Sequence, residues 1–252
     1  MPVALVLLAV LLLGACSSPG TDSSAPSPSP TVQGAGRFAD PAELGTALQD
    51  AALAAGSAQG DLIASSADGR VDGAVAYEFA TDDVAISADV SVSGPISADL
   101  GVVLADGTVY LRVPTLYQLF TSAPWVRLPT GAGSDISDQA DGLVEALAAE
   151  VPGTSLVDLD DPSSTLTFVG SDSIDGVAVE LYEARSTVDG VDIERTYWVD
   201  DDDLLRRLDS IARDPAQSVP ATSRHTYTEW GEPVSVEVPD PADVADFPEG
   251  LL

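Results

Sequence analysis

Apolar and polar residues alternate with a period of two over most of the chain beyond Gly60, and this alternation limits the fold more than any other feature. Successive side chains of a β-strand point to opposite faces, so such segments predict strands with one apolar face. Helical patterns do not alternate regularly with these segments, which argues against βαβ units and favours an antiparallel sheet. The predicted strands cover residues 75–79, 84–92, 100–104, 109–113, 125–128, 166–169, 177–184, 193–199, 204–211, 226–230 and 234–238.

Turn and helix signals separate these strands. Asp-Gly pairs at 106–107, 175–176 and 189–190 stand between alternating runs, a pattern typical of tight hairpins. A first helix is predicted from Asp40, which can cap it, to Gly56, which ends it. A second helix is predicted over residues 136–151, before a Pro-Gly pair.

One apolar face of such a sheet must be hidden from water. We therefore expect an α+β fold: a strongly curved antiparallel β-sheet, or half-barrel, with a few helices covering its concave face. The first helix presents a narrow stripe made mainly of Leu and Ala. Small side chains either let a helix approach the sheet closely or leave space, and only the second outcome yields a ligand cavity.

Charge and composition exclude several classes of function. The chain has 41 acidic and ten basic residues, for a net charge of −31, and a chain with this charge repels nucleic acid. It contains one cysteine and one histidine, which excludes a disulfide within the chain and metal sites built from several imidazoles or thiolates. We expect neither a metal nor another cofactor.

The N-terminus predicts where the protein resides. Residues 3–13 are apolar but too short to cross a bilayer, which takes about 20 residues. They precede Leu13-Gly14-Ala15-Cys16, which resembles the lipobox of bacterial lipoproteins and implies that Cys16 receives a diacylglyceryl group and fatty acids such as palmitate. We expect a signal peptide over 1–15, an acylated Cys16 with a Ser/Pro-rich tether over 16–36, and a single domain over 37–252.

Several short motifs resemble a known family. They are DGTVY at 106–110, PWVRL at 124–128, DGVAV at 175–179, RTYWVD at 195–200 and YTEWGEPV at 227–234. Over roughly residues 40–240 the chain resembles the LppX/LprG-type actinobacterial lipoproteins, and it is similar to LolA-type carriers. The resemblance implies a half-barrel that holds acyl chains of a lipid or glycolipid and carries or presents them in the cell envelope. It implies no catalytic residues.

Strand parity predicts which side chains would line such a cavity, although a shift of one residue would reverse each strand's set. We also expect the protein to act as a monomer that is anchored by lipid to the extracytoplasmic face of the cell membrane. The candidate lining residues are Leu48, Val75, Tyr77, Phe79, Ile86, Val90, Leu100, Val102, Leu104, Leu111 and Leu147.

Other residues suggest chemistry only weakly. The sequence contains no G-x-S-x-G motif whose serine His225 could activate, and His225 is interpreted as a partly exposed strand residue. The run 200–203 of four Asp residues is either a solvated hairpin turn or a calcium ligand set without EF-hand spacing. Trp125, Trp198 and Trp230 are expected in the core.

Two alternative functions stay open at this point. The first is a cell-surface interaction or sensor module with a filled core and no lipid ligand. The second is a hydrolase with a pair of carboxylates, which would lie in a polar cleft.

Overall fold

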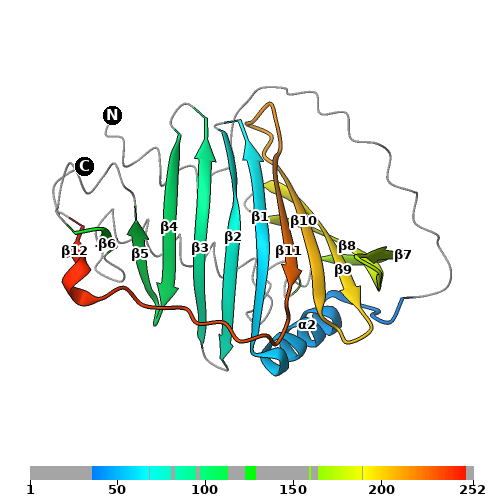
Figure 1. Cartoon of the computed structure of the whole chain (residues 1–252). Coiled ribbons are helices and arrows are strands. Elements are labelled where there is room, and N and C mark those ends of the chain that lie inside the picture. The colour runs from blue at the N-terminus through cyan, green and yellow to red at the C-terminus, as the bar shows by residue number, and fades with distance from the viewer. Residues whose placement is uncertain are drawn as a thin grey trace.

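A computed structural model of the chain describes residues 36–67, 69–80, 83–94, 97–112, 123–128, 159, 164–188 and 190–247. Its strands form one 12-stranded, strongly curved sheet with edges at β12 and β7 (Figure 1). The predicted α+β class with a curved, mainly antiparallel sheet is therefore confirmed. The strands are β1 (Ser57–Ser66), β2 (Gly69–Ala80), β3 (Asp83–Ser93), β4 (Ala98–Ala105), β5 (Thr108–Arg112), β6 (Trp125–Arg127), β7 (Thr165–Ile174), β8 (Val177–Val188), β9 (Val191–Asp200), β10 (Leu205–Arg213), β11 (Ala221–Thr228) and β12 (Val244–Asp246).

Two antiparallel meanders make up the sheet, which has the order β12-β6-β5-β4-β3-β2-β1-β11-β10-β9-β8-β7. Strands β1 to β6 extend from the middle toward one edge, and β7 to β11 extend toward the other. They meet where β1 pairs with β11, with Leu62 opposite His225. The short β12 alone pairs in parallel, with β6, among the described strands.

The tight turns at 106–107 and 175–176 form as their Asp-Gly pairs predict, whereas Asp189 of the third pair lies outside the described residues. Asp106 and Gly107 between β4 and β5 both have positive φ, 50° and 66°, and Asp175 and Gly176 between β7 and β8 have 51° and 84°. Positive φ at both central residues belongs to the type I′ turn, whose twist matches that of paired strands. These local signals set the register of two hairpins.

Glycines in the two central strands bring backbones into close contact. A Cβ atom at Gly60 in β1 would lie 2.0 Å from the carbonyl oxygen of Thr226, and one at Gly73 in β2 would lie 2.2 Å from that of Asp89. Both strands therefore require a residue without a side chain here. Glycine inside a strand often marks a bend or a close approach, which suits the middle of a strongly curved sheet.

Helix α2 (Pro41–Ala55) lies across the end of β1 and β2 (Figure 1). The Asp40 carboxylate accepts the Glu43 N–H at 2.9 Å, and the Glu43 carboxylate accepts the Ala39 N–H at 2.9 Å. Gly56, at φ 77°, ends the helix. The first predicted helix is thus confirmed, including its cap. No helix in the described ranges has the length and the hydropathy that crossing a membrane requires.

The C-terminal segment connects the middle of the sheet to its edge. After β11 the chain crosses the strand ends that lie near α2 and reaches the 3-10 helix η1 (Pro241–Asp243) and β12 (Figure 1). Near its start, Gly231 donates to the Ser57 carbonyl at 3.0 Å, and the Ser57 hydroxyl donates to the Glu232 carbonyl at 2.6 Å.

Two details of the predicted strands were wrong. Residues 234–238 form no strand, because this segment runs across the sheet end without joining a ladder. The strand predicted over 226–230 is β11, which begins at Ala221 and ends at Thr228. The helix predicted over 136–151, and with it the idea of several covering helices, lies outside the described residues.

Candidate functional site

The candidate site is the concave face of the sheet. Nine of the predicted lining residues share this face, and Leu48 of α2 belongs to the same buried cluster. Register explains the nine: Val75 lies opposite Ala88, Ala88 opposite Val102, and Val102 opposite Leu111. Leu147 and Cys16 lie outside the described residues. That the shared face lines a ligand cavity stays a prediction. The nine are Val75, Tyr77, Phe79, Ile86, Val90, Leu100, Val102, Leu104 and Leu111.

Two clusters of buried apolar side chains lie along this face. The larger includes α2 and the adjoining ends of the strands, whereas the smaller consists of Val71, Val90, Val92 and Leu100, farther from α2 along β2, β3 and β4. Ala88 is only partly buried and contacts both clusters. The apolar wall therefore continues from the α2 end across Ala88 toward the opposite strand ends.

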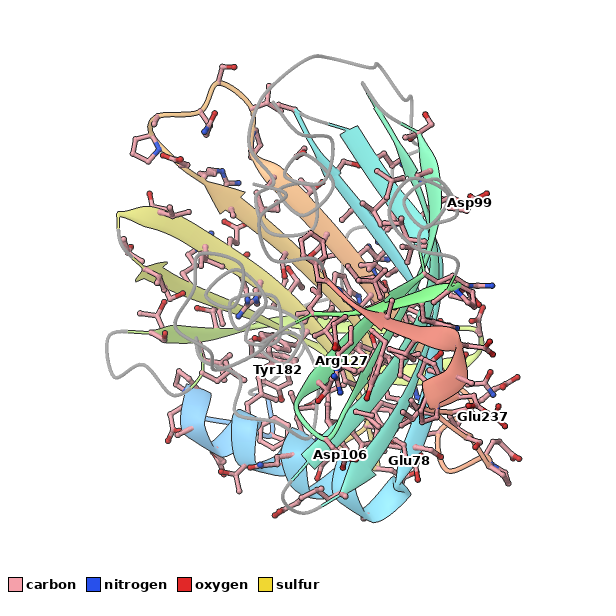
Figure 2. All side chains as sticks on the ribbon, turned by 90° about the vertical axis from the view of Figure 1, so that its left-hand side faces the viewer. Glu78, Asp99, Asp106, Arg127, Tyr182 and Glu237 are labelled. Carbon is pink, nitrogen blue, oxygen red and sulfur yellow. The ribbon has the colours of Figure 1, made fainter. Side chains whose placement is uncertain are left out.

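The α2 end of the concavity is filled by the protein's own side chains. Leu44 and Ala52 of α2 are fully buried, Leu48 is 1% exposed, and Tyr182 and Tyr197 on the facing strands are fully buried. Figure 2 shows Tyr182 inside the curve of the sheet above α2. The small residues of α2 thus permit close approach here. Farther along the wall, the side chains of Val71, Val90, Val92 and Leu100 are also buried, at 4–5% exposure.

Aromatic rings complete this filled end. Phe79 stacks on Trp230 with ring centroids 5.8 Å apart, and Tyr227 lies 5.7 Å from Tyr77 and 5.8 Å from Trp230. The Trp230 indole N–H donates to the Leu205 carbonyl at 3.1 Å. Contacts of this kind add about 0.5–1.5 kcal/mol per pair to area burial, so this end of the sheet is a rigid base.

The segment before α2 is attached to the β8–β9 side of the sheet. The Arg37 guanidinium donates to Glu180 at 3.0 Å, to Asp203 at 2.6 Å and to the Asp200 carbonyl at 2.5 Å. The Tyr182 hydroxyl donates to Glu180 and accepts the Arg37 N–H at 2.7 Å. These bonds hold the point where the predicted tether would join the domain.

These contacts shift the pKa values of Tyr182 and Glu180 in opposite directions. Burial, together with the hydrogen bond to Glu180, raises the pKa of Tyr182 to about 12. Burial alone would raise the pKa of Glu180, but hydrogen bonds from Tyr182 and Arg37 outweigh it, so the pKa of this carboxyl is lowered. The neutral phenol and the ionised carboxylate are both favoured near neutral pH.

Polar side chains occupy part of the concave face, and the sequence analysis missed most of them. His225 is only 7% exposed and stacks on Tyr227 at 6.2 Å, so its interpretation as a partly exposed residue is wrong. Arg195, Ser210 and Ser223 follow one another across β9, β10 and β11. Parity offered a signal, because Arg195 is two residues before the inward Tyr197.

The run of Asp residues forms the turn between β9 and β10, as predicted, but it is not wholly solvated. Asp200 is 2% exposed, and its carboxylate accepts the N–H groups of Asp202 and Leu204 at 3.0 Å and the Arg206 Nε at 2.6 Å. The hydrogen bonds of this carboxylate therefore stabilise the turn. Within the described ranges, no three His, Cys, Asp or Glu side chains are grouped as metal ligands would be.

Two tryptophans contact arginines instead of the core interior. The Arg207 guanidinium lies 4.3 Å from the Trp198 ring centre, and that of Arg112 lies 5.5 Å from the Trp125 ring centre. Arg207 and Arg224 also bind Asp209 and, against its burial, lower the pKa of that carboxyl. The core position expected for every tryptophan holds for Trp230, whereas Trp125 and Trp198 are stacked under cations.

An open hollow of about 280 Å³ lies over β3 and β4, with polar residues of the outer face in its lining. Asp89 forms an ion pair with Arg112 at 2.6 Å, and Asp99 accepts the Ser91 hydroxyl at 2.7 Å. Figure 2 shows Asp99 on the outer side of the sheet. Both carboxylates are exposed, unlike the buried acid that glycoside hydrolysis requires, so this hollow does not favour a hydrolase.

Comparisons with known proteins concern the fold alone. No protein-family model matches the chain, and no curated protein matches its sequence. The lipoprotein LppX of Mycobacterium tuberculosis is similar in structure, with a TM-score of 0.45 and 15% identity over 79% of this chain and 100% of LppX. MucB alone is similar with a TM-score of 0.42 and 15% identity over 78% of this chain and 62% of MucB. MucB in complex with MucA(peri) is similar with a TM-score of 0.41 and 14% identity over 80% of this chain and 59% of MucB.

Proposed function

We propose that the chain is a lipoprotein of the cell envelope that holds acyl chains of a lipid or glycolipid against its concave face and carries or presents them. In this proposal Cys16 bears the lipid anchor, the domain is a monomer on the extracytoplasmic face of the membrane, and no catalysis takes place. The observation that carries the proposal is the apolar wall on β2 to β5, which continues beyond the filled α2 end.

The width of the wall is comparable with the length of an acyl chain. Apolar residues face inward on four adjacent strands, three strand spacings or about 14 Å across the sheet. The acyl chains of one leaflet span about half of the roughly 30 Å hydrocarbon core. Burial of about 400 Å² of acyl surface at about 25 cal/mol per Å² would contribute about 10 kcal/mol before the cost of association.

The N-terminal sequence supports a location where such a ligand is available. The predicted tether over 16–36 is rich in Ser and Pro, and an extended chain of this kind rises about 3.1 Å per residue. It would let an anchored domain reach roughly 60 Å from the bilayer. A carrier needs this freedom to collect a lipid at one surface and release it at another.

Native mass spectrometry of the full chain, purified from the envelope of a lipidating host, tests the proposal. We expect lipid to co-purify in addition to the covalent anchor. Ala88→Trp, which places a ring at the junction of the two clusters, should reduce the bound lipid at least tenfold. Ser87→Trp, one residue away on the outer face, is the matched control and should leave it unchanged. Far-UV circular dichroism checks that both variants keep the sheet.

One observation favours a second candidate, an interaction or sensor module with a filled core. The α2 end is closed by its own side chains, and a similar filling along the whole concavity would leave no room for a lipid. Repeated recovery of bare protein, with no response to Ala88→Trp, would favour this module and reject the carrier.

A further inference from the structure

The apolar wall is closed in this structure, so a ligand can reach it only if a covering element moves. The buried apolar side chains of β2 to β4 are 2–7% exposed. On the β5 side of the wall, Leu128 is 3% exposed and Phe247 packs against the same cluster. Phe247 directly follows β12, which pairs with β6 at this edge of the sheet. The C-terminal segment therefore helps to close the wall.

This segment leaves the middle of the sheet from a firmly held point. Trp230 packs among the aromatic rings of the filled α2 end and donates its indole N–H to the Leu205 carbonyl at 3.1 Å. Gly231 donates to the Ser57 carbonyl at 3.0 Å, and the Ser57 hydroxyl donates to the Glu232 carbonyl at 2.6 Å. These bonds fix the chain up to residue 232.

Beyond this point the chain is not hydrogen-bonded to the sheet. Residues 233–239, which we call the arm, run along the strand ends near α2 (Figure 1). They form no hydrogen bond or ion pair with the part of the chain that the structure describes, and the apolar Val238 is 48% exposed. Pro233 and Pro239 fix φ at both ends of the arm and limit its bending. The arm is therefore a stiff connection without bonds of its own.

The end of the segment is held weakly. Residues 240–247, which we call the tip, comprise η1, β12 and Phe247, and none of them is fully buried. Strands β6 and β12 are each three residues long, whereas β2 and β3 have 12 and 11 residues. The ion pair of Arg127 with Asp246 joins side chains that are 51% and 74% exposed, and such pairs contribute little. Elements with few buried contacts and exposed hydrogen bonds open at the lowest free energy.

We propose that residues 233–247 form a C-terminal latch, whose tip undocks from β6 as a unit and opens the β5 side of the apolar wall to an acyl chain. This inference rests on the proposed function and adds how its site is opened. The firmly held start keeps the tip close to β6, so the tip docks again once the ligand has entered. The arm permits this movement because no bond to the sheet has to break along it.

Hydrogen exchange of the full chain, followed by mass spectrometry, tests the movement itself. We expect peptides that cover residues 240–247 to exchange at least a hundredfold faster than peptides of β2 and β3. Phe247→Ala removes the side chain that packs the tip against the apolar cluster and should accelerate this exchange at least threefold further. Val238→Ala, which shortens an exposed apolar side chain of the arm, is the matched control and should leave it unchanged. Exchange of the tip as slow as that of β3 would overturn the latch.

A disulfide lock tests whether the movement controls access to the wall. Arg127→Cys combined with Asp246→Cys joins β6 to β12 at register partners, which in adjacent strands lie about 4.8 Å apart, within the range that a disulfide spans. Vesicles of equal parts deuterated phosphatidylglycerol and phosphatidylcholine supply the lipid, and mass spectrometry measures the labelled lipid bound over time. We expect the oxidised protein to take up lipid at least tenfold more slowly than the wild type, and reduction to restore the rate.

Ala76→Cys combined with Ser87→Cys is the matched control, because it joins register partners of β2 and β3, which need not separate. Its oxidation should leave the uptake rate unchanged. Unchanged uptake by the oxidised lock would overturn the latch and leave the carrier proposal intact. If the lock does not fold, Phe247→Ala decides in its place, since faster uptake supports the latch and unchanged uptake rejects it. Absence of uptake by the wild type would instead reject the carrier, and the latch as its entrance, however fast the tip exchanges.

Discussion

The buried carboxylate of Asp200 leads to the most specific stability prediction. It is the first of four consecutive Asp residues, yet it alone is almost fully buried, and it binds two turn N–H groups and Arg206. Substitution by Ala leaves the Arg206 charge without this partner and the two N–H groups without their acceptor. The reasoning predicts a large cost at Asp200 and almost none at its exposed neighbour Asp201.

The expected magnitude follows from these bonds. A hydrogen bond to a charged group contributes about 1.5–3 kcal/mol, and breaking a buried ion pair costs about 3–5 kcal/mol. Arg206 is 23% exposed and water can reach it in part, which lowers the total. We expect Asp200→Ala to lower the free energy of unfolding by about 3–4 kcal/mol. Asp200→Asn, which keeps an acceptor for the N–H groups, should cost about half as much.

Urea unfolding of the full chain, followed by circular dichroism, measures these differences. Asp201→Ala is the control and should change the free energy of unfolding by less than about 0.5 kcal/mol. A double-mutant cycle with Arg206→Gln isolates the ion pair. Equal effects at Asp200 and Asp201, or a cost below about 1 kcal/mol at Asp200, would refute the role assigned to this carboxylate.

Three further predictions concern packing, backbone and pH. Leu48→Ala should lower the free energy of unfolding by about 2–5 kcal/mol in urea denaturation, because it opens a cavity at the filled end; no loss would show that this end is not packed. Gly60→Ala should lower the melting temperature more than Gly107→Ala, since its Cβ meets a carbonyl oxygen at 2.0 Å whereas that of Gly107 meets nothing within 4 Å; the reverse order would contradict this view of β1. Stability should fall between pH 10 and about 12, because the pKa of Tyr182 is raised from 10.0 to about 12, so the contribution is complete below pH 10 and lost as the folded phenol ionises. When unfolding is measured as a function of pH, Tyr182→Phe should not show this loss of stability between pH 10 and about 12. A pH profile identical to that of the wild type would contradict the role of the Tyr182 phenol.

Much of the local structure could be predicted from the sequence. Alternation assigned the inward residues of β2, β3 and β4 to one face, and their membership of the two apolar clusters agrees with that parity. The Asp40 cap and the Asp106-Gly107 turn were recognisable because caps and tight turns depend on a few adjacent residues and their permitted φ angles.

Patterns failed where an extended segment needed a partner. Residues 234–238 alternate as a strand does but join no ladder, and Val238 is 48% exposed. Conversely, β1 contains two polar-rich stretches and Gly60, so alternation defined no strand there, although β1 lies in the middle of the sheet. Periodicity reports which way side chains point and not whether another strand lies alongside.

The sequence by itself determined the strand faces, two hairpin turns and the capped first helix. Only the tertiary structure decided that β1 pairs with β11, that Asp200 is buried while Asp201 is exposed, and that Arg195 faces the concavity beside Ser210. The reason is physical. Side-chain direction and turn geometry depend on neighbours in the chain, whereas strand partners, curvature and burial depend on the packing of the whole sheet, including pairs as distant in sequence as Leu62 and His225.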